Sequence, residues 1–284
     1  MDFTLTTYKT LLKTLQQQSF VFQTFQEFIE YSAPFRESKG VSEENRKTIV
    51  LRHDVDKLPQ NSLCFAQIQH ELGIKGSYYF RIVPESFDPE IISEIVSLGH
   101  EVGLHYETID LSAKLLHQNS EFRIQNSKLR EEDIAHKAIE LFKEQLDKLR
   151  QYYPVKTICM HGSPLSKYDN KLLWKYYNYR DYGIIGEPYF DIDFSNVLYL
   201  TDTGRRWDGD SVSIRDKVSS SGFRAPSFRD TSDIINTAKK GKLPDQIMLT
   251  FHPQRWTDSP LPWVKELVLQ NAKNVVKYFL NKIR

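Results

Sequence analysis

The 284-residue sequence lacks most of the features that mark secreted and membrane proteins. It holds two cysteines, Cys64 and Cys159, and no CxxC pair, which indicates small buried side chains in a reducing compartment. No run of about 18 apolar residues occurs, so no membrane span is predicted. The N-terminus also lacks the basic and apolar regions of a secretory signal, and a cytoplasmic location is expected.

Evidence for a nucleic-acid or nucleotide ligand is missing as well. The formal net charge is +1, so the chain as a whole has no excess positive charge to attract nucleic acid. No GxGxxG or GxxxxGK[ST] sequence follows an apolar run. With 40% hydrophobic and 26% charged residues the chain is typical of a globular protein, and 13% aromatic residues suit a sugar-binding cleft or a large core.

Strand-like and helical patterns alternate through most of the chain. The strand-like runs are nearly all apolar, which predicts a parallel sheet covered on both faces. About seven strand–helix units favour an irregular (β/α)7-type barrel, with an open doubly wound sheet as the alternative. The runs are TIVLRH (48–53), KGSYYFRI (75–82), HEVGLH (100–105), KTICMH (156–161), YGIIGE (182–187), NVLYLT (196–201) and QIMLTFH (246–252).

Helical spacing of apolar residues precedes the first of these strands. It covers residues 8–15 and 22–29, which predicts a short pair of helices. Residues 1–47 are therefore expected to form an N-terminal helical extension and loop packed on the barrel, and residues 48–284 to form the barrel domain.

Acidic and histidine side chains stand where four of the strands end. Asp54 and Asp56 end the first run, and residues two apart in a strand share a face. Two adjacent carboxylates need a cation or a proton between them, so a metal ion is one explanation and an Asp that caps the next helix is the other. His105, His161 and His252 end three further runs. A lone histidine is more often structural, but chemistry gathers at the carboxyl ends of parallel strands, so the five together favour a site.

Two clusters combine aromatic and basic residues after strands, in TDTGRRW (201–207) and HPQRW (252–256). Tryptophan faces stack on sugar C–H surfaces and arginine pairs with phosphate or carboxylate, so these clusters are predicted to bind substrate. Core packing with a surface ion pair is an equal alternative. The residues concerned are Arg205, Trp207, Arg255 and Trp256.

Several of these stretches resemble motifs of the polysaccharide deacetylase (NodB-like) family. GHEVGLH (99–105) looks like the motif that brings in a metal-binding histidine, and LRHDVD (51–56) resembles the motif that holds a catalytic aspartate and a metal-binding one. MLTFHPQRW (248–256) is similar to the motif that ends in the general-acid histidine, and MHGSP (160–164) occupies the place of the third motif. The resemblance covers roughly residues 49–256 and implies a barrel of the glycoside hydrolase/deacetylase kind.

Carried over residue by residue, the resemblance implies Asp54 as catalytic base, His252 as general acid, and Asp56 and His105 as metal ligands. The chain departs from the family at Ile109, where a second metal histidine is usual. It also has Asp54-Val55-Asp56 in place of two consecutive aspartates, and a sequence beginning at His161 in place of Arg-x-Pro-Tyr. His161 is the candidate third ligand, with Glu107 as a weaker one.

The predicted function is a metal-dependent hydrolase that removes an N-acyl group, with acetyl preferred, from an amino sugar. A divalent ion, zinc by preference, would polarise the acyl carbonyl and lower the pKa of its water towards about 7. The expected substrate is a small carbohydrate or a lipid- or nucleotide-linked sugar, and no oligomeric state is predicted. The alternatives are a catalytically silent carbohydrate-binding barrel, and a metal-dependent glycosidase that uses Asp202 and Asp208.

Overall fold

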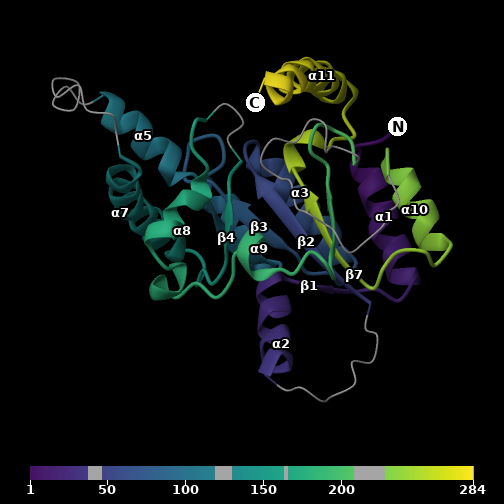
Figure 1. Ribbon diagram of the computed structural model, residues 1–284. Helices are drawn as coiled ribbons and strands as arrows, with labels where there is room; N and C mark the ends of the chain where they lie inside the picture. The colour runs from purple at the N-terminus through teal and green to yellow at the C-terminus, as the bar shows by residue number, and fades with distance from the viewer. Residues whose placement is uncertain (38–46, 119–129, 163–165, 208–227, 284) are drawn as a thin grey trace.

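The computed structural model describes residues 1–37, 47–118, 130–162, 166–207 and 228–283. Within them, helices surround one parallel sheet (Figure 1). The strands are β1 (Val21–Gln23), β2 (Thr48–Val55), β3 (Ser77–Phe80), β4 (Glu101–Tyr106), β5 (Ile158–Met160), β6 (Leu198–Thr201) and β7 (Gln246–Phe251). The α-helices are α1 (Leu5–Gln17), α2 (Phe25–Glu37), α3 (Pro59–Glu71), α4 (Pro89–Ser97), α5 (Thr108–Gln118), α7 (Glu131–Arg150), α8 (Leu173–Tyr176), α9 (Pro188–Asp191), α10 (Thr231–Lys239) and α11 (Pro260–Ile283). Three short 3₁₀ helices are η1 (Asn170–Leu172), η2 (Tyr179–Tyr182) and η4 (Pro253–Arg255).

The order of the strands distinguishes a barrel from an open sheet. The order is β5-β4-β3-β2-β7-β6, so the last strand, β7, pairs with β2, the first strand after the N-terminal segment. The register runs from Thr48 opposite Gln246 to His53 opposite Phe251. In a doubly wound sheet the last strand lies at an outer edge, whereas pairing of last with first is the closure of a barrel. The predicted irregular (β/α) barrel is therefore confirmed, and its described strands leave the ring open between β5 and β6.

One predicted strand is wrong. Within residues 182–187 only Gly186 makes a β-bridge, to Thr157, and η2 ends at Tyr182. Gly183 adopts a left-handed conformation (φ 72°), and the Glu187 side chain accepts from the Tyr189 N–H to begin α9. The short apolar run therefore lies between a turn and a helix start, which leaves no room for a strand.

The N-terminal segment contributes to both the sheet and the core. Helix α1 is present as predicted and buries Tyr8, Leu11 and Leu15. The second helix begins at Phe25 rather than at residue 22, because Val21–Gln23 form β1 and pair with the first half of β2.

Alternation along β2 divides the apolar residues into two clusters. Ile49, Leu51 and Val55 belong to the outer cluster, between the sheet and the helices. Val50 belongs to the inner cluster, which fills the barrel together with Tyr79, Cys159 and Met248 from three other strands. Since residues two apart share a face, Arg52 and Asp54 follow Val50 on the inner face of β2. This alternation is why a buried strand ends with charged side chains that point into the barrel.

Gly103 is required on the inner face of β4. A Cβ atom at this position would lie 2.4 Å from Tyr79 Cε1 and 2.7 Å from the carbonyl oxygen of Thr157. The Tyr79 ring therefore occupies the space that any larger residue would need, two positions before His105.

Candidate active site

The structure brings the five predicted site residues together at the carboxyl ends of the strands. Asp56 Oδ1 lies 3.6 Å from His105 Nε2 and 3.4 Å from His161 Nε2. Asp54 Oδ2 lies 3.9 Å from the same His105 nitrogen. His252 comes directly after Phe251, the register partner of His53, so His252 and Asp54 are neighbours on adjacent strands with side chains on one face.

The spacing of three of these residues suits a tetrahedral metal ion. Zinc binds histidine and carboxylate at about 2.0–2.2 Å, which places tetrahedral ligand atoms roughly 3.3–3.5 Å apart. The two Asp56–histidine distances lie close to this range. Asp56 Oδ1 is buried with no hydrogen-bond partner, while its Oδ2 accepts from Gln254 Nε2 at 2.9 Å. A buried carboxylate oxygen without a donor is costly, so the donor set of Asp56, His105 and His161 fits a divalent cation.

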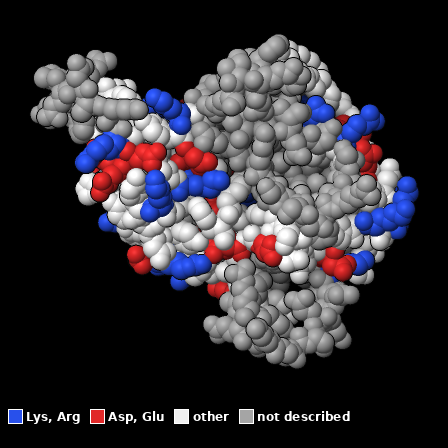
Figure 2. All heavy atoms as spheres, in the orientation of Figure 1, with Lys and Arg blue, Asp and Glu red and all other residues white. Residues whose placement is uncertain are grey.

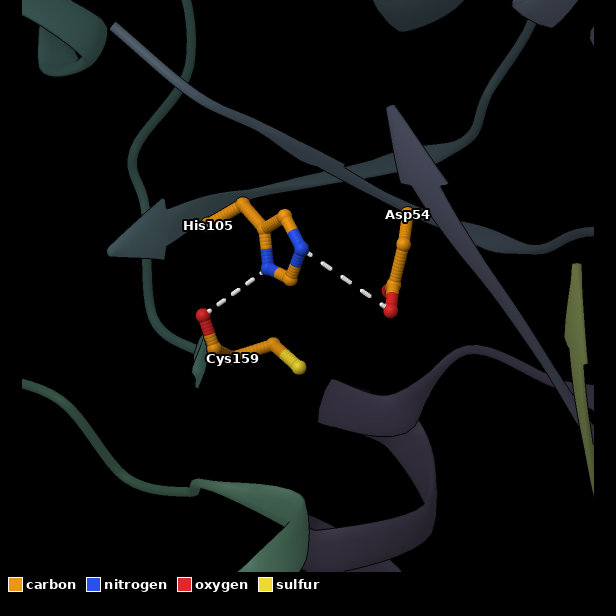
Figure 3. Close-up of side chains that lie close together, drawn as sticks. All are labelled: Asp54, His105 and Cys159. Atoms are coloured by element: carbon orange, nitrogen blue, oxygen red, sulfur yellow. Dashed lines mark hydrogen bonds and ion pairs between the residues drawn. The ribbon is translucent and has the colours of Figure 1, made fainter. Parts of the chain in front are cut away.

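Each of the two histidines is oriented by a second group. His105 Nδ1 lies 3.1 Å from the carbonyl oxygen of Cys159, so Nδ1 carries the proton and Nε2 presents its lone pair towards Asp54 (Figure 3). His161 Nδ1 lies 3.2 Å from Glu107 Oε2. Such contacts fix the tautomer and the ring orientation of metal-binding histidines. The weaker ligand candidate Glu107 is therefore a partner of His161, and Arg81 holds it in place with contacts of 2.7 and 3.0 Å.

The charges of these groups are coupled. Burial opposes ionisation of Asp56, but His105, His161 and His252 outweigh burial and hold the pKa of Asp56 well below its usual value. For His161, burial lowers the pKa, yet Glu107 and Asp56 together raise it above its usual value. The carboxylates are thus ionised at neutral pH, and a cation placed among them lowers their mutual repulsion.

Ile109 lies away from the site. It is fully buried in the outer apolar cluster, at the start of α5. After Asp56 and His105, the third candidate ligand is His161. It follows β5, whereas Ile109 follows β4.

Arg52 clamps Asp54, and the sequence interpretation missed this contact. Arg52 Nε donates to Asp54 Oδ1 at 2.8 Å and Nη2 donates to Oδ2 at 2.6 Å, with both side chains almost completely buried. Burial raises the pKa of Asp54, but the charge of Arg52 outweighs burial and the pKa is lowered overall. The guanidinium also lies 5.2 Å from the ring of Tyr189. The signal in the sequence was the two-residue spacing, which puts Arg52 and Asp54 on one face of a strand.

His252 is held by Asp202. His252 Nδ1 lies 2.5 Å from Asp202 Oδ1, and the His252 N–H donates to Oδ2 at 3.0 Å. Because an ionised carboxylate only accepts, Nδ1 carries the proton, and Nε2 is the atom that can exchange a proton with a substrate. Asp202 follows β6 and is completely buried, so it lacks the access that a glycosidase acid needs. The other acid considered for that role, Asp208, lies outside the described residues.

The four residues predicted to bind substrate are all buried in the protein. Trp256 is fully buried and donates from Nε1 to Asp202 Oδ2 at 2.6 Å, while Arg255 Nη1 donates to Asp202 Oδ1 at 3.0 Å. Trp207 is 4% exposed and donates to Thr231. Arg205 donates to the carbonyl of Trp263 and lies over its ring. Both tryptophans are buried, which favours the core-packing alternative for them, and Arg255 and Trp256 hold Asp202.

Charged side chains of both signs occur on the face of the molecule drawn in Figure 2. Lysine and arginine are interspersed with aspartate and glutamate on the face drawn in Figure 2, so the described residues there form no large patch of one sign. Among the described residues, no helix combines the length and apolar character needed to cross a bilayer.

Comparison with known proteins gives distant matches only. No protein-family model matches the chain, and no curated protein matches it. Among solved structures, the chain is similar to a wild-type CE4 family pseudoenzyme from Bacillus anthracis and to mutants of it, one of them described as having restored enzymatic activity. The identity is 14%, the TM-scores are 0.37 to 0.38, and the match covers 81% of this chain. It covers 62 to 64% of those chains, so this chain spans less than two thirds of their length. At 14% identity and these TM-scores, no property of those proteins is carried over to this chain.

Proposed function

We propose that this protein is a metal-dependent hydrolase that removes an N-acyl group, preferentially acetyl, from an amino sugar. The observation that carries the proposal is the triad of Asp56, His105 and His161, whose ligand atoms lie within 4.8 Å of one another and include one buried carboxylate oxygen that lacks a hydrogen-bond donor. A base candidate, Asp54, and an acid candidate, His252, flank this triad on adjacent strands. The substrate is a small carbohydrate or a lipid- or nucleotide-linked sugar.

The two flanking residues have opposite tasks. A divalent ion, zinc by preference, would supply Lewis-acid polarisation of the acyl carbonyl when bound to the triad. Asp54, which Arg52 keeps ionised, accepts a proton from the attacking water. His252 donates a proton from Nε2 to the departing amine, while Asp202 fixes the orientation of its ring.

Metal content and activity test these assignments together. The purified protein should hold about one zinc ion per chain and release acetate from N-acetylated amino-sugar oligomers. His105→Ala should lose both the metal and the activity. His252→Ala should keep the metal and lose activity by about 10²- to 10⁴-fold. The matched control is His136→Ala, which removes an exposed histidine of α7.

Two results would contradict the proposal in different ways. Metal retained at full occupancy in His105→Ala would assign the ligand role to other residues. A wild-type protein that is fully loaded with zinc, yet inactive on acylated amino sugars, would favour a silent carbohydrate-binding barrel.

A further inference from the structure

Helix α11 packs on the protein through one side and leaves several large apolar side chains exposed on another. Trp263 Nε1 donates to the carbonyl of Asp2, Asn274 Nδ2 donates to the carbonyl of Gly204, and Gln270 is 4% exposed. At about 100° per residue these three fall on one side of the helix. A surface helix ordinarily turns its apolar residues towards the protein, whereas α11 leaves several of them exposed.

A second side of α11, about 130° around the helix from the first, carries an apolar stripe. The stripe consists of Leu261, Val264, Val268 and Val275, which at about 100° per residue fall within an arc of roughly 60°. Their exposed fractions are 84%, 51%, 62% and 57%. A contiguous exposed row of this kind, rather than scattered single residues, indicates a binding surface.

Charge indicates what covers the stripe. The segment 260–284 contains five basic residues and one acidic residue, Glu266, although the whole chain has 38 basic and 37 acidic residues. The described lysines Lys265 and Lys273 are exposed. A second copy of α11 would bring these positive charges together, whereas anionic lipid headgroups complement them.

The position of α11 relates the stripe to the active site. Glu266 pairs with Lys57, and Arg205 donates to the carbonyl of Trp263. Lys57 follows Asp56, and Arg205 lies three residues after Asp202, so α11 packs on the loops at the carboxyl ends of β2 and β6. Figure 1 shows α11 beyond the ends of β2 and β7.

We propose that α11 lies in the interface of an anionic lipid bilayer, with the stripe inserted among the lipids, so that the barrel acts on amino sugars attached to lipid. The choice of a lipid-linked substrate rests on the proposed function. Docking itself requires neither metal nor catalysis.

Co-sedimentation of the full chain with lipid vesicles tests the docking. The protein should pellet with phosphatidylcholine vesicles that contain about 30% phosphatidylglycerol, bind pure phosphatidylcholine more weakly, and dissociate at high salt. Val268→Glu should weaken binding to the anionic vesicles by at least roughly tenfold, because it places a charge where the proposed docking inserts an apolar side chain among the lipids. Leu115→Glu is the matched control, since Leu115 of α5 is 47% exposed and far from α11 in the fold.

The results separate docking from catalysis. No binding of the wild type to anionic vesicles would overturn the proposal, as would equal weakening by Leu115→Glu. A dimer in sedimentation analysis that Val268→Glu dissociates, without vesicle binding, would assign the stripe to a second copy of the chain. Vesicle binding that Val268→Glu abolishes supports the docking even if the protein proves unable to deacylate any sugar.

Discussion

Arg52 keeps the side chain of Asp54 ionised. It is completely buried in the barrel, and its Nη1 has no hydrogen-bond partner while the other guanidinium nitrogens contact Asp54. A buried charge pair adds little stability by itself, but removal of one partner leaves the other charge uncompensated.

Arg52→Met should therefore lower the free energy of unfolding by about 3–5 kcal/mol, measured by urea denaturation. It should also raise the pKa of Asp54, because burial then acts without the opposing guanidinium. Arg52→Lys keeps the charge but not the bidentate contact. Its free energy of unfolding should therefore lie between those of the wild type and Arg52→Met. An Arg52→Met variant as stable as the wild type would show that the pair of Arg52 and Asp54 does not contribute to the stability of the fold.

The site residues differ in how far sequence alone could predict them. The inward direction of Asp54 and Asp56 followed from the two-residue period of a strand, and Arg52 could have been included by the same rule. The partners of Asp202 could not be predicted, because His252 and Trp256 lie 50 and 54 positions away and meet it only through the pairing of β6 with β7. Tryptophan and arginine after a strand look alike in sequence whether they bind a sugar or support a carboxylate.

At the scale of elements, long apolar strands were predictable and short ones were not. β2 and β7, with eight and six residues, both have continuous apolar runs. β1 has three residues and lies just before a helix, so its apolar residues were assigned to the helical pattern. The run at 182–187 has strand-like residues, yet the turn at Gly183 and the helix start at Pro188 prevent a strand.

The contact between β3 and β4 gives a prediction at this scale. Gly103→Ala should lower the free energy of unfolding by about 1–3 kcal/mol, because the new Cβ meets the Tyr79 ring and the carbonyl of Thr157. Gly73→Ala is the control, since Gly73 has a positive φ but open space, so only backbone strain of about 1 kcal/mol is expected. Thermal and urea unfolding of both variants measure the difference. Full activity and stability in Gly103→Ala would mean that the ring moves aside freely.

At the scale of the whole molecule, buried neutral histidines make stability depend on pH. His53 stacks on Tyr78, and its Nδ1 lies 3.1 Å from the carbonyl of Ser77. Burial lowers the pKa of His53 to about 3. The unfolded chain binds a proton below about pH 6.5 while the folded protein does not, so stability is complete above pH 6.5 and falls as the pH decreases towards 3.

His53 should therefore cost the protein about 2 kcal/mol of stability between pH 7.5 and pH 5. Urea denaturation at a series of pH values measures this slope. His53→Asn should be less stable at every pH but should lack this part of the slope, and the difference between the two proteins isolates His53. Equal slopes would show that folding does not lower the pKa of His53.

The pairing of β2 with β7 also determines the order in which parts of the barrel can form during synthesis on the ribosome. β2 pairs with β7 through Thr48 and Gln246, which are 198 positions apart. At about 5–20 residues per second, synthesis leaves the β2 edge without this partner for roughly 10 to 40 s. By contrast, Asp56, His105 and His161 are all present once residue 161 has been made. The nascent chain can thus assemble the proposed metal ligands early, while the open apolar edge of β2 remains unpaired and needs protection from other nascent chains.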